Sequence, residues 1–157
     1  MNNSPSTVIQ DALQQLNKEL IALREFVALL SSEQKSLLDN DSEKLLALSE
    51  VKTNAANQLM EMSRLRRQKL LGSSPDNMET WIAKHAPQSR AIWNDIRKLA
   101  DQAQQLNTTN GELINSKMRN NQQALNVLFN SAKNAAGLYG PDGQANLNSS
   151  GRHLGSG

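Results

Sequence analysis

The sequence contains no cysteine among its 157 residues. Disulfide bonds, thiol catalysis and metal sites built on cysteine are therefore excluded. Aromatic residues make up only 3% of the chain and hydrophobic residues 38%, with a mean hydropathy of −0.59. A compact α/β enzyme needs a larger apolar core than this composition supplies. The composition instead favours an elongated helical protein.

The sequence also lacks a strong net charge and long apolar runs. Its 17 basic and 15 acidic side chains leave a net charge of +2, too small to draw the chain to nucleic acid or a membrane. No run approaches the roughly 20 apolar residues of a membrane span. The N-terminus has neither the basic nor the apolar region of a secretory signal. We therefore expect a cytoplasmic protein with no integral membrane segment and no nucleic-acid partner.

Patterns for catalysis and metal binding are absent as well. No P-loop, GxGxxG, HExxH or GxSxG motif occurs, and no Glu-x-x-His pair is present for a di-metal bundle. The only histidines, His85 and His153, lie far apart in the sequence. We expect no enzyme activity, no catalytic residue, no metal and no cofactor. We interpret the acidic residues of the first half as solvent-exposed: Glu19, Glu25, Glu33, Asp39, Asp41, Glu43 and Glu50.

Heptad spacing is the clearest pattern that the sequence does contain. Ser4-Pro5 is a good helix start. Apolar residues then recur at alternating steps of four and three, with Gln34 interrupting one position, which predicts a long helix with a coiled-coil seam. Asn40 and Glu43 have capping-box spacing, so a second, antiparallel helix is predicted to begin near them and to end at Gly72. The residues of the seam are Ile9, Leu13, Leu16, Leu20, Leu23, Val27, Leu30 and Leu37.

Two more helices are predicted after residue 74. A short one starts at Ser74-Pro75 and stops at Ala86-Pro87, and a third long helix runs from about Gln88 to Ala136. Gly111 is a candidate kink in that helix. The predicted fold is all-α: an elongated antiparallel helical bundle or coiled coil of three long helices plus a short helix. We expect one domain over residues 1–136 and a flexible Gly/Ser/Asn-rich tail over residues 137–157.

Three groups of residues are open to more than one interpretation. A basic cluster near the end of the second helix is interpreted as its polar face, with phosphate binding as the alternative. Trp81 and Trp93 flank Pro87 and are expected to anchor that turn, with a ligand pocket between them as the alternative. Tyr139, the only tyrosine, is either a docking point or a side chain packed on the bundle. The basic cluster consists of Arg64, Arg66, Arg67 and Lys69.

The second half of the third long helix carries a stripe of apolar residues. This is more apolar surface than a helix exposed to solvent on all sides needs. Either the first two helices cover the stripe or another protein does. We call these residues the binding stripe: Ile114, Met118, Leu125, Leu128 and Phe129.

Two late segments are the most specific part of the sequence. Residues 107–114 read Asn-Thr-Thr-Asn-Gly-Glu-Leu-Ile, and residues 138–143 read Leu-Tyr-Gly-Pro-Asp-Gly. Upstream lie a long first helix and, after a short acidic break, a second helix with Leu45 and Lys52. In this order the parts resemble the FlgN family of flagellar type III export chaperones, and the resemblance covers nearly the whole chain.

The resemblance implies a cytoplasmic chaperone for the hook-filament junction proteins FlgK and FlgL. Such a chaperone prevents premature assembly of their terminal helical segments and delivers them to the export gate protein FlhA. The family places substrate binding in the C-terminal region, where the apolar pattern selects the binding stripe, and gate docking at a tyrosine that matches Tyr139. The alternatives are a structural coiled-coil or adaptor protein that self-associates through residues 13–37, and a helical enzyme or metal carrier.

Overall fold

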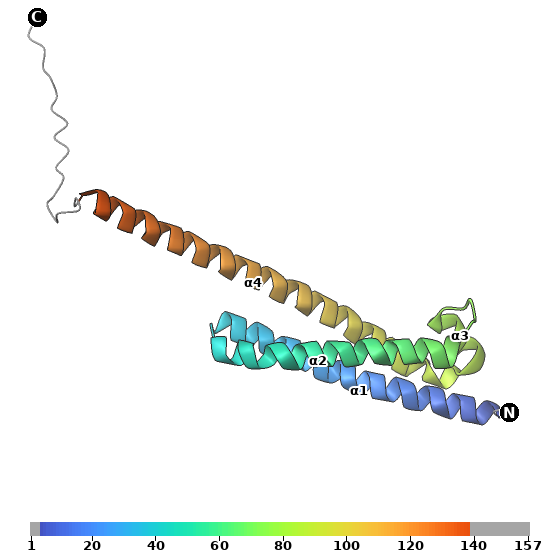
Figure 1. Cartoon of the computed structure of the whole chain (residues 1–157). Coiled ribbons are helices and arrows are strands. Elements are labelled where there is room, and N and C mark those ends of the chain that lie inside the picture. The colour runs from blue at the N-terminus through green and yellow to red at the C-terminus, as the bar shows by residue number, and fades with distance from the viewer. Residues whose placement is uncertain (1–3, 139–157) are drawn as a thin grey trace, which may run out of the picture. The chain divides into compact units, whose positions relative to one another are not determined.

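The computed structural model describes residues 4–138, which form helices joined by short turns and contain no strand (Figure 1). The elements are α1 (Pro5–Leu38), α2 (Ser42–Arg66), the π-helix η1 (Arg67–Leu71), α3 (Met78–His85), the 3₁₀ turn η2 (Pro87–Ser89) and α4 (Arg90–Leu138). The all-α prediction of three long helices and one short helix is therefore confirmed. The chain divides into two compact units, Met1–Ile114 and Asn115–Gly157.

The core of the first unit is built on the predicted seam of α1. Leu16 and Leu30 are completely buried, and Leu20, Leu23 and Val27 are nearly so. Side chains of α3 and of the first part of α4, among them Ile82 and Ile96, complete the same core. The heptad pattern of α1 thus forms an intramolecular core.

The turn between α1 and α2 stops one helix and starts the next within three residues. Asn40 adopts a left-handed conformation with a φ of 55°, which asparagine tolerates better than most residues. The amide of Asp41 donates to the carbonyl of Ser36 and the amide of Asn40 to that of Leu37, the Schellman pattern of a helix end. The Asp41 side chain then accepts from the amide of Lys44 at 3.1 Å and caps α2.

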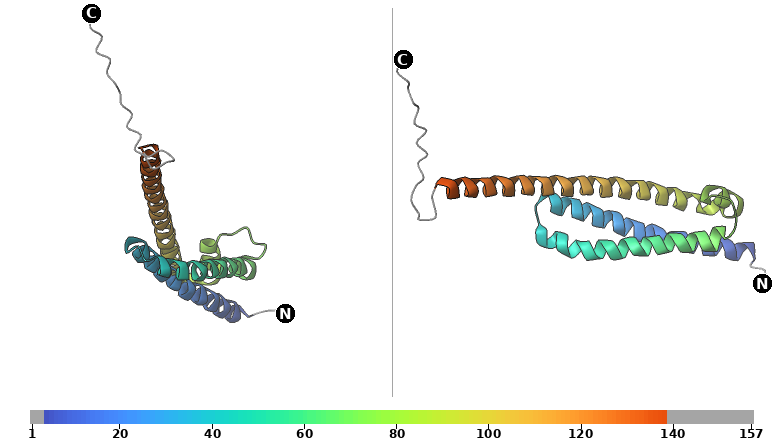
Figure 2. Two further views of the ribbon diagram at one scale, coloured as in Figure 1. Left: turned by 60° about the vertical axis from the view of Figure 1, so that its left-hand side comes forward. Right: turned by 45° about the horizontal axis from the view of Figure 1, so that its top comes forward.

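The predicted capping residue is therefore wrong by one position, because Asn40 ends α1 and Asp41 begins α2. The resulting turn is short, and α1 and α2 run antiparallel beside each other, as the two views of Figure 2 show. The predicted antiparallel pair is present.

The chain changes direction in the segment between α2 and α3. At η1 the α-helix widens into a π-helix, and Gly72 leaves it with a φ of 54°, a conformation suited to glycine. The side chain of Asn77, rather than Ser74, caps the short helix by accepting from the amide of Thr80 at 2.8 Å. The short helix therefore begins later than predicted, and it buries Met78, Trp81 and Ile82.

The last helix, α4, is continuous from Arg90 to Leu138 and passes through Gly111 without interruption. A Cβ added at Gly111 would meet no atom within 4 Å. The glycine is therefore not required there by a close approach of another segment. The predicted domain over residues 1–136 stays a prediction, and nearly all of the predicted tail lies outside the described residues.

Candidate functional site

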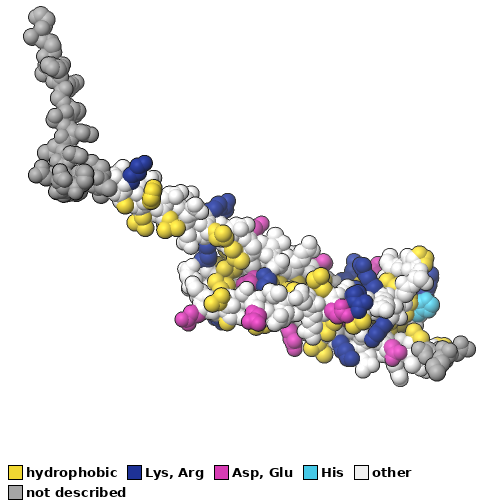
Figure 3. Space-filling view, in the orientation of Figure 1, with side chains coloured by type: hydrophobic (Ala, Val, Ile, Leu, Met, Phe, Trp, Pro, Cys, Tyr) yellow, Lys and Arg dark blue, Asp and Glu magenta, His cyan; other side chains and the backbone are white. Residues whose placement is uncertain are grey.

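The residues of the binding stripe are exposed. Ile114, the last residue of the first unit, is 38% exposed, and the four members in the second unit range from 64% for Met118 to 70% for Phe129. Figure 3 shows yellow side chains along the part of α4 that leads to the grey residues. Large apolar side chains at helical spacing and without cover are typical of a surface that binds another protein.

The same part of α4 carries charge of one sign only. From Leu113 to Leu138 the chain has three basic residues, Lys117, Arg119 and Lys133, and no acidic residue. Asparagine, glutamine and serine supply the remaining polar surface. The binding stripe is therefore an apolar surface in a locally basic setting, although the whole chain is nearly neutral.

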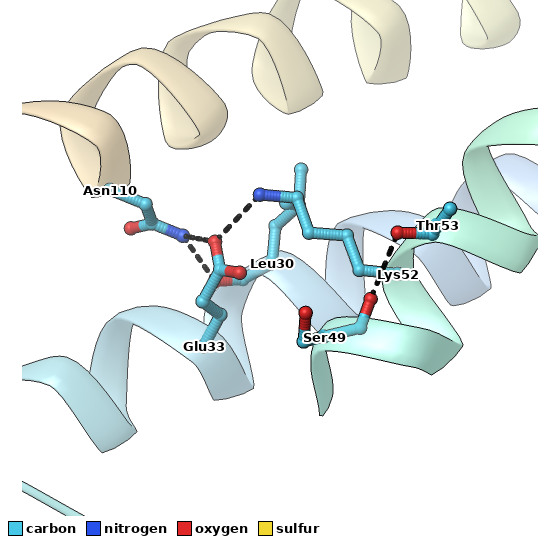
Figure 4. Close-up of polar contacts among 6 residues, drawn as sticks. All are labelled: Leu30, Glu33, Ser49, Lys52, Thr53 and Asn110. Carbon is cyan, nitrogen blue, oxygen red and sulfur yellow. Dashed lines mark hydrogen bonds and ion pairs between the residues drawn. The ribbon is translucent and has the colours of Figure 1, made fainter. Parts of the chain in front are cut away.

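A buried polar cluster ties α4 to α1 and α2 shortly before the stripe (Figure 4). The Nδ2 atom of Asn110 donates to Glu33 Oε1 and to the carbonyl oxygen of Leu30, both at 2.9 Å. Lys52 Nζ donates to the same Glu33 oxygen at 3.0 Å. Asn110 is completely buried and Glu33 is 6% exposed. These contacts join three helices of the first unit at one point.

A second buried ion pair lies elsewhere in the first unit. The guanidinium of Arg66 donates to Glu19 Oε1, and its Cζ atom lies 4.8 Å from the centre of the Trp93 ring. Both charged residues are more than nine-tenths buried. A guanidinium over an indole ring gains cation–π attraction in addition to the ion pair. Arg66 therefore joins α2 to α1 and α4.

Two expectations about charged residues are thus wrong. Glu19 and Glu33 were expected in solvent but are buried in ion pairs, and Arg66 belongs to the interior rather than to a polar face. Their partners are distant in sequence, so neither spacing nor composition indicates them. The other acids of that group, such as Glu25 and Glu50, are exposed as predicted.

The rest of the basic cluster behaves as ordinary helix surface. Arg64 forms an exposed ion pair with Glu61 one turn earlier on α2. Its hydrogen bonds to the Glu61 carboxylate lower the pKa of Glu61 below its ordinary value and raise the pKa of Arg64. Arg67 and Lys69 are exposed.

The remaining candidates lie partly inside and partly outside the described residues. Trp81 is buried in the core, and its ring centre lies 5.3 Å from that of His85 at the end of α3. Between residues 4 and 138, no three His, Cys, Asp or Glu side chains are grouped to hold a metal ion. Tyr139, predicted to dock at the export gate, and His153 both lie outside the described residues.

Comparison with known proteins identifies the family of this chain. A family model described as FlgN protein matches residues 1–147, which is most of the chain. The chain belongs to the FlgN family. No curated protein and no solved structure matches it significantly. FlgN proteins are flagellar export chaperones and not enzymes, so an export chaperone is the general function of this chain.

None of the helices described between residues 4 and 138 has the length and apolar character needed to cross a membrane. The exposed binding stripe of α4 is the candidate partner-binding surface of this FlgN protein.

Proposed function

We propose that this FlgN protein is a cytoplasmic chaperone that binds the hook-filament junction proteins FlgK and FlgL. It covers their terminal helical segments so that these do not assemble early, and it delivers them to the export gate protein FlhA. In this proposal the binding stripe contacts the substrate and Tyr139 contacts the gate. The general function of the family is export chaperoning. The proposal adds the named partners and the residues that contact them.

The exposure of the binding stripe is the observation that carries the proposal. The subunits of a filament present amphipathic helices that must later pack with one another. A chaperone with an uncovered apolar helix face occupies such a surface temporarily, in the helix-in-groove manner. Met118 lies in the stripe, and its flexible thioether side chain adapts to more than one partner. This property suits a chaperone with two substrates.

The test is co-elution of FlgK and FlgL fragments that carry their terminal helices with the full-length chaperone. The wild-type protein should form a soluble complex with each fragment. Replacing both Leu125 and Leu128 by aspartate should weaken binding by at least about tenfold, because large apolar contacts at the centre of an interface dominate affinity. Thermal unfolding should change little, because both side chains are exposed.

Val127→Asp is the matched control. Val127 is 63% exposed and Leu125 is 65% exposed, and both lie on the same stretch of α4. At 3.6 residues per turn, however, two positions correspond to about 200° around the helix, so Val127 faces away from the stripe. This substitution should leave binding unchanged. If neither junction-protein fragment co-elutes with the wild-type chaperone, the proposal is wrong.

The alternative, a coiled-coil protein that self-associates through residues 13–37, has less support. The apolar residues of that seam, including Leu16, Leu23 and Leu30, are buried within the first unit. The seam is therefore already occupied by other helices of the same chain. Light scattering of the free protein tests this alternative, which requires a stable dimer.

A further inference from the structure

An open cavity of the first unit is lined by the end of α2, by η1, by the start of α3 and by the start of α4. Its volume of about 730 Å³ lies within the range of about 300–1,000 Å³ that is typical of ligand sites. The lining includes three arginines, one carboxylate and three large apolar side chains. The cavity is separate from the four stripe residues of the second unit.

The backbone on one side of the cavity is irregular. Arg67 and Leu71 lie at the two ends of η1, where the α-helix widens into a π-helix, and Gly72 follows with its left-handed φ of 54°. All three residues line the cavity. π-Helical turns are rare and are frequently found at functional sites. Here the turn brings a cation and an apolar side chain to the same cavity.

Two of the three arginines already have carboxylate partners. Arg64 pairs with Glu61 at 2.7 Å. Arg66 pairs with Glu19. Arg67 forms no ion pair with any residue described between positions 4 and 138. In exposure it resembles ordinary helix surface, but its place at the cavity makes its charge available to a ligand.

The carboxylate of the lining does not cancel the charge of Arg67. Asp76 accepts from Lys84 Nζ at 3.0 and 3.2 Å, so these two charges offset each other. The start of α3, at Asn77 and Met78, lines the same cavity. The first amides of a helix have no acceptor within it and carry partial positive charge. The cavity therefore attracts an anion.

Two buried donors at the cavity are unmatched. Arg66 Nε and Trp93 Nε1 are buried, and neither donates to an acceptor in the described part of the chain. Arg66 is only 8% exposed, and both residues line the cavity. A buried donor without an acceptor is costly, and its dipole adds to the positive potential of the wall. Both donors favour an oxyanion over a neutral or cationic group.

Large apolar side chains line the rest of the cavity, namely Leu71, Met78 and Trp93. A bare inorganic ion would gain nothing from them, whereas a carboxylate joined to an apolar group would contact both kinds of surface. Export chaperones act on other proteins. A polypeptide offers such a group where an apolar residue adjoins an acidic residue or ends the chain.

We propose that this cavity binds a carboxylate of a partner polypeptide together with the apolar side chain next to it. Arg67 and the start of α3 contact the carboxylate, and Leu71 and Met78 contact the apolar side chain. A chain end and an acidic side chain supply the same chemistry. The cavity gives the chaperone a contact in the first unit in addition to the binding stripe.

Short peptides titrated into the ¹⁵N-labelled full-length protein test this assignment. One ends in leucine with a free carboxylate, the second is the same peptide amidated, and the third is amidated but contains Leu-Glu. The indole N–H signal of Trp93 reports binding. That of Trp81, which is buried in the core and does not line the cavity, is the internal reference.

At low salt at least one carboxylate peptide should bind at least about fivefold more tightly than the neutral peptide. The peptide that binds identifies the source of the carboxylate. If neither carboxylate peptide binds more tightly than the neutral one, the proposal is overturned. Inorganic phosphate should bind more weakly than the preferred peptide. Equal affinity for phosphate would show that the cavity selects charge alone, which contradicts a polypeptide ligand.

Arg67→Gln shows whether the attraction arises at the cavity. The variant should bind the preferred peptide at least about fivefold more weakly, with unchanged thermal unfolding because Arg67 is exposed. Lys69→Gln is the matched control, since Lys69 is also exposed on η1 but lines a different cavity beside α1. Equal losses for the two variants would overturn the role of Arg67. The peptides contain no junction-protein sequence, so co-elution of FlgK and FlgL tests the proposed function separately.

Discussion

Asn110 shows at the scale of one residue how this protein uses polar groups in its interior. Its amide satisfies an acceptor on the α1 backbone and one on Glu33, and Lys52 satisfies the same carboxylate from α2. A buried carboxylate is expensive unless it is paired and hydrogen-bonded, and here it has both a cation and an amide. The cluster therefore fixes which residues of the three helices lie opposite one another.

Asn110→Asp tests that role, because the substitution preserves shape but removes the donor. It places a second carboxylate beside that of Glu33, so we expect a loss of about 1–3 kcal/mol or more in the free energy of unfolding. Chemical denaturation at neutral pH measures the change. Asn107→Asp, an exposed position on the same helix, is the control and should cost far less. Equal losses for the two variants would show that the cluster contributes little.

The charged residues that sequence reasoning misplaced share one physical reason. Glu19 pairs with a residue 47 positions away, and Glu33 hydrogen-bonds to one 77 positions away. Charge at a helix position predicts exposure unless a partner is known, and partners at such distances depend on the tertiary fold. The apolar seam of α1, by contrast, was predicted correctly because its period is local.

At the scale of helices, the elements begin and end close to where the sequence predicts. Pro5 opens α1, and Pro87 separates α3 from α4. Their local conformational preferences are strong enough to be recognised without the fold. The start of α3 is less well predicted, because both Ser74 and Asn77 are suitable capping residues and only Asn77 makes the bond. The π-helix η1 has no recognisable local signal in the sequence.

Replacing either of two glycines by alanine should change the stability of the protein, with opposite signs at the two positions. Gly111 lies inside α4 with open space where a Cβ would be, so Gly111→Ala should stabilise the protein by about 0.5–1 kcal/mol. Gly72 has a φ of 54°, so Gly72→Ala should destabilise it by about 1–2 kcal/mol. Thermal unfolding of both variants measures the two signs. A destabilised Gly111→Ala variant would show that the helix needs the glycine for a bend.

At the scale of the whole molecule, the buried core and most of the binding stripe lie in different units of the chain. The buried core residues all belong to the first unit, whereas no residue described between Asn115 and Asn134 is buried. Substitutions on the binding stripe should therefore alter affinity with little effect on folding. The sequence predicted the stripe from its apolar spacing, but spacing does not reveal whether a neighbouring helix covers it. Only the exposed fractions of the side chains show that the stripe is uncovered.

Tyr139→Ala tests the last step of the proposed function, delivery to the gate. If Tyr139 contacts FlhA, loss of the aromatic ring should weaken binding to FlhA by about tenfold or more, since aromatic side chains are frequent anchors of interfaces. The melting temperature and the affinity for FlgK and FlgL fragments should stay nearly unchanged. Tyr139→Phe, which keeps the ring, should retain most of the gate affinity. A large fall in melting temperature for Tyr139→Ala would instead identify a side chain packed on the helices, and gate docking would then have to be assigned to other residues.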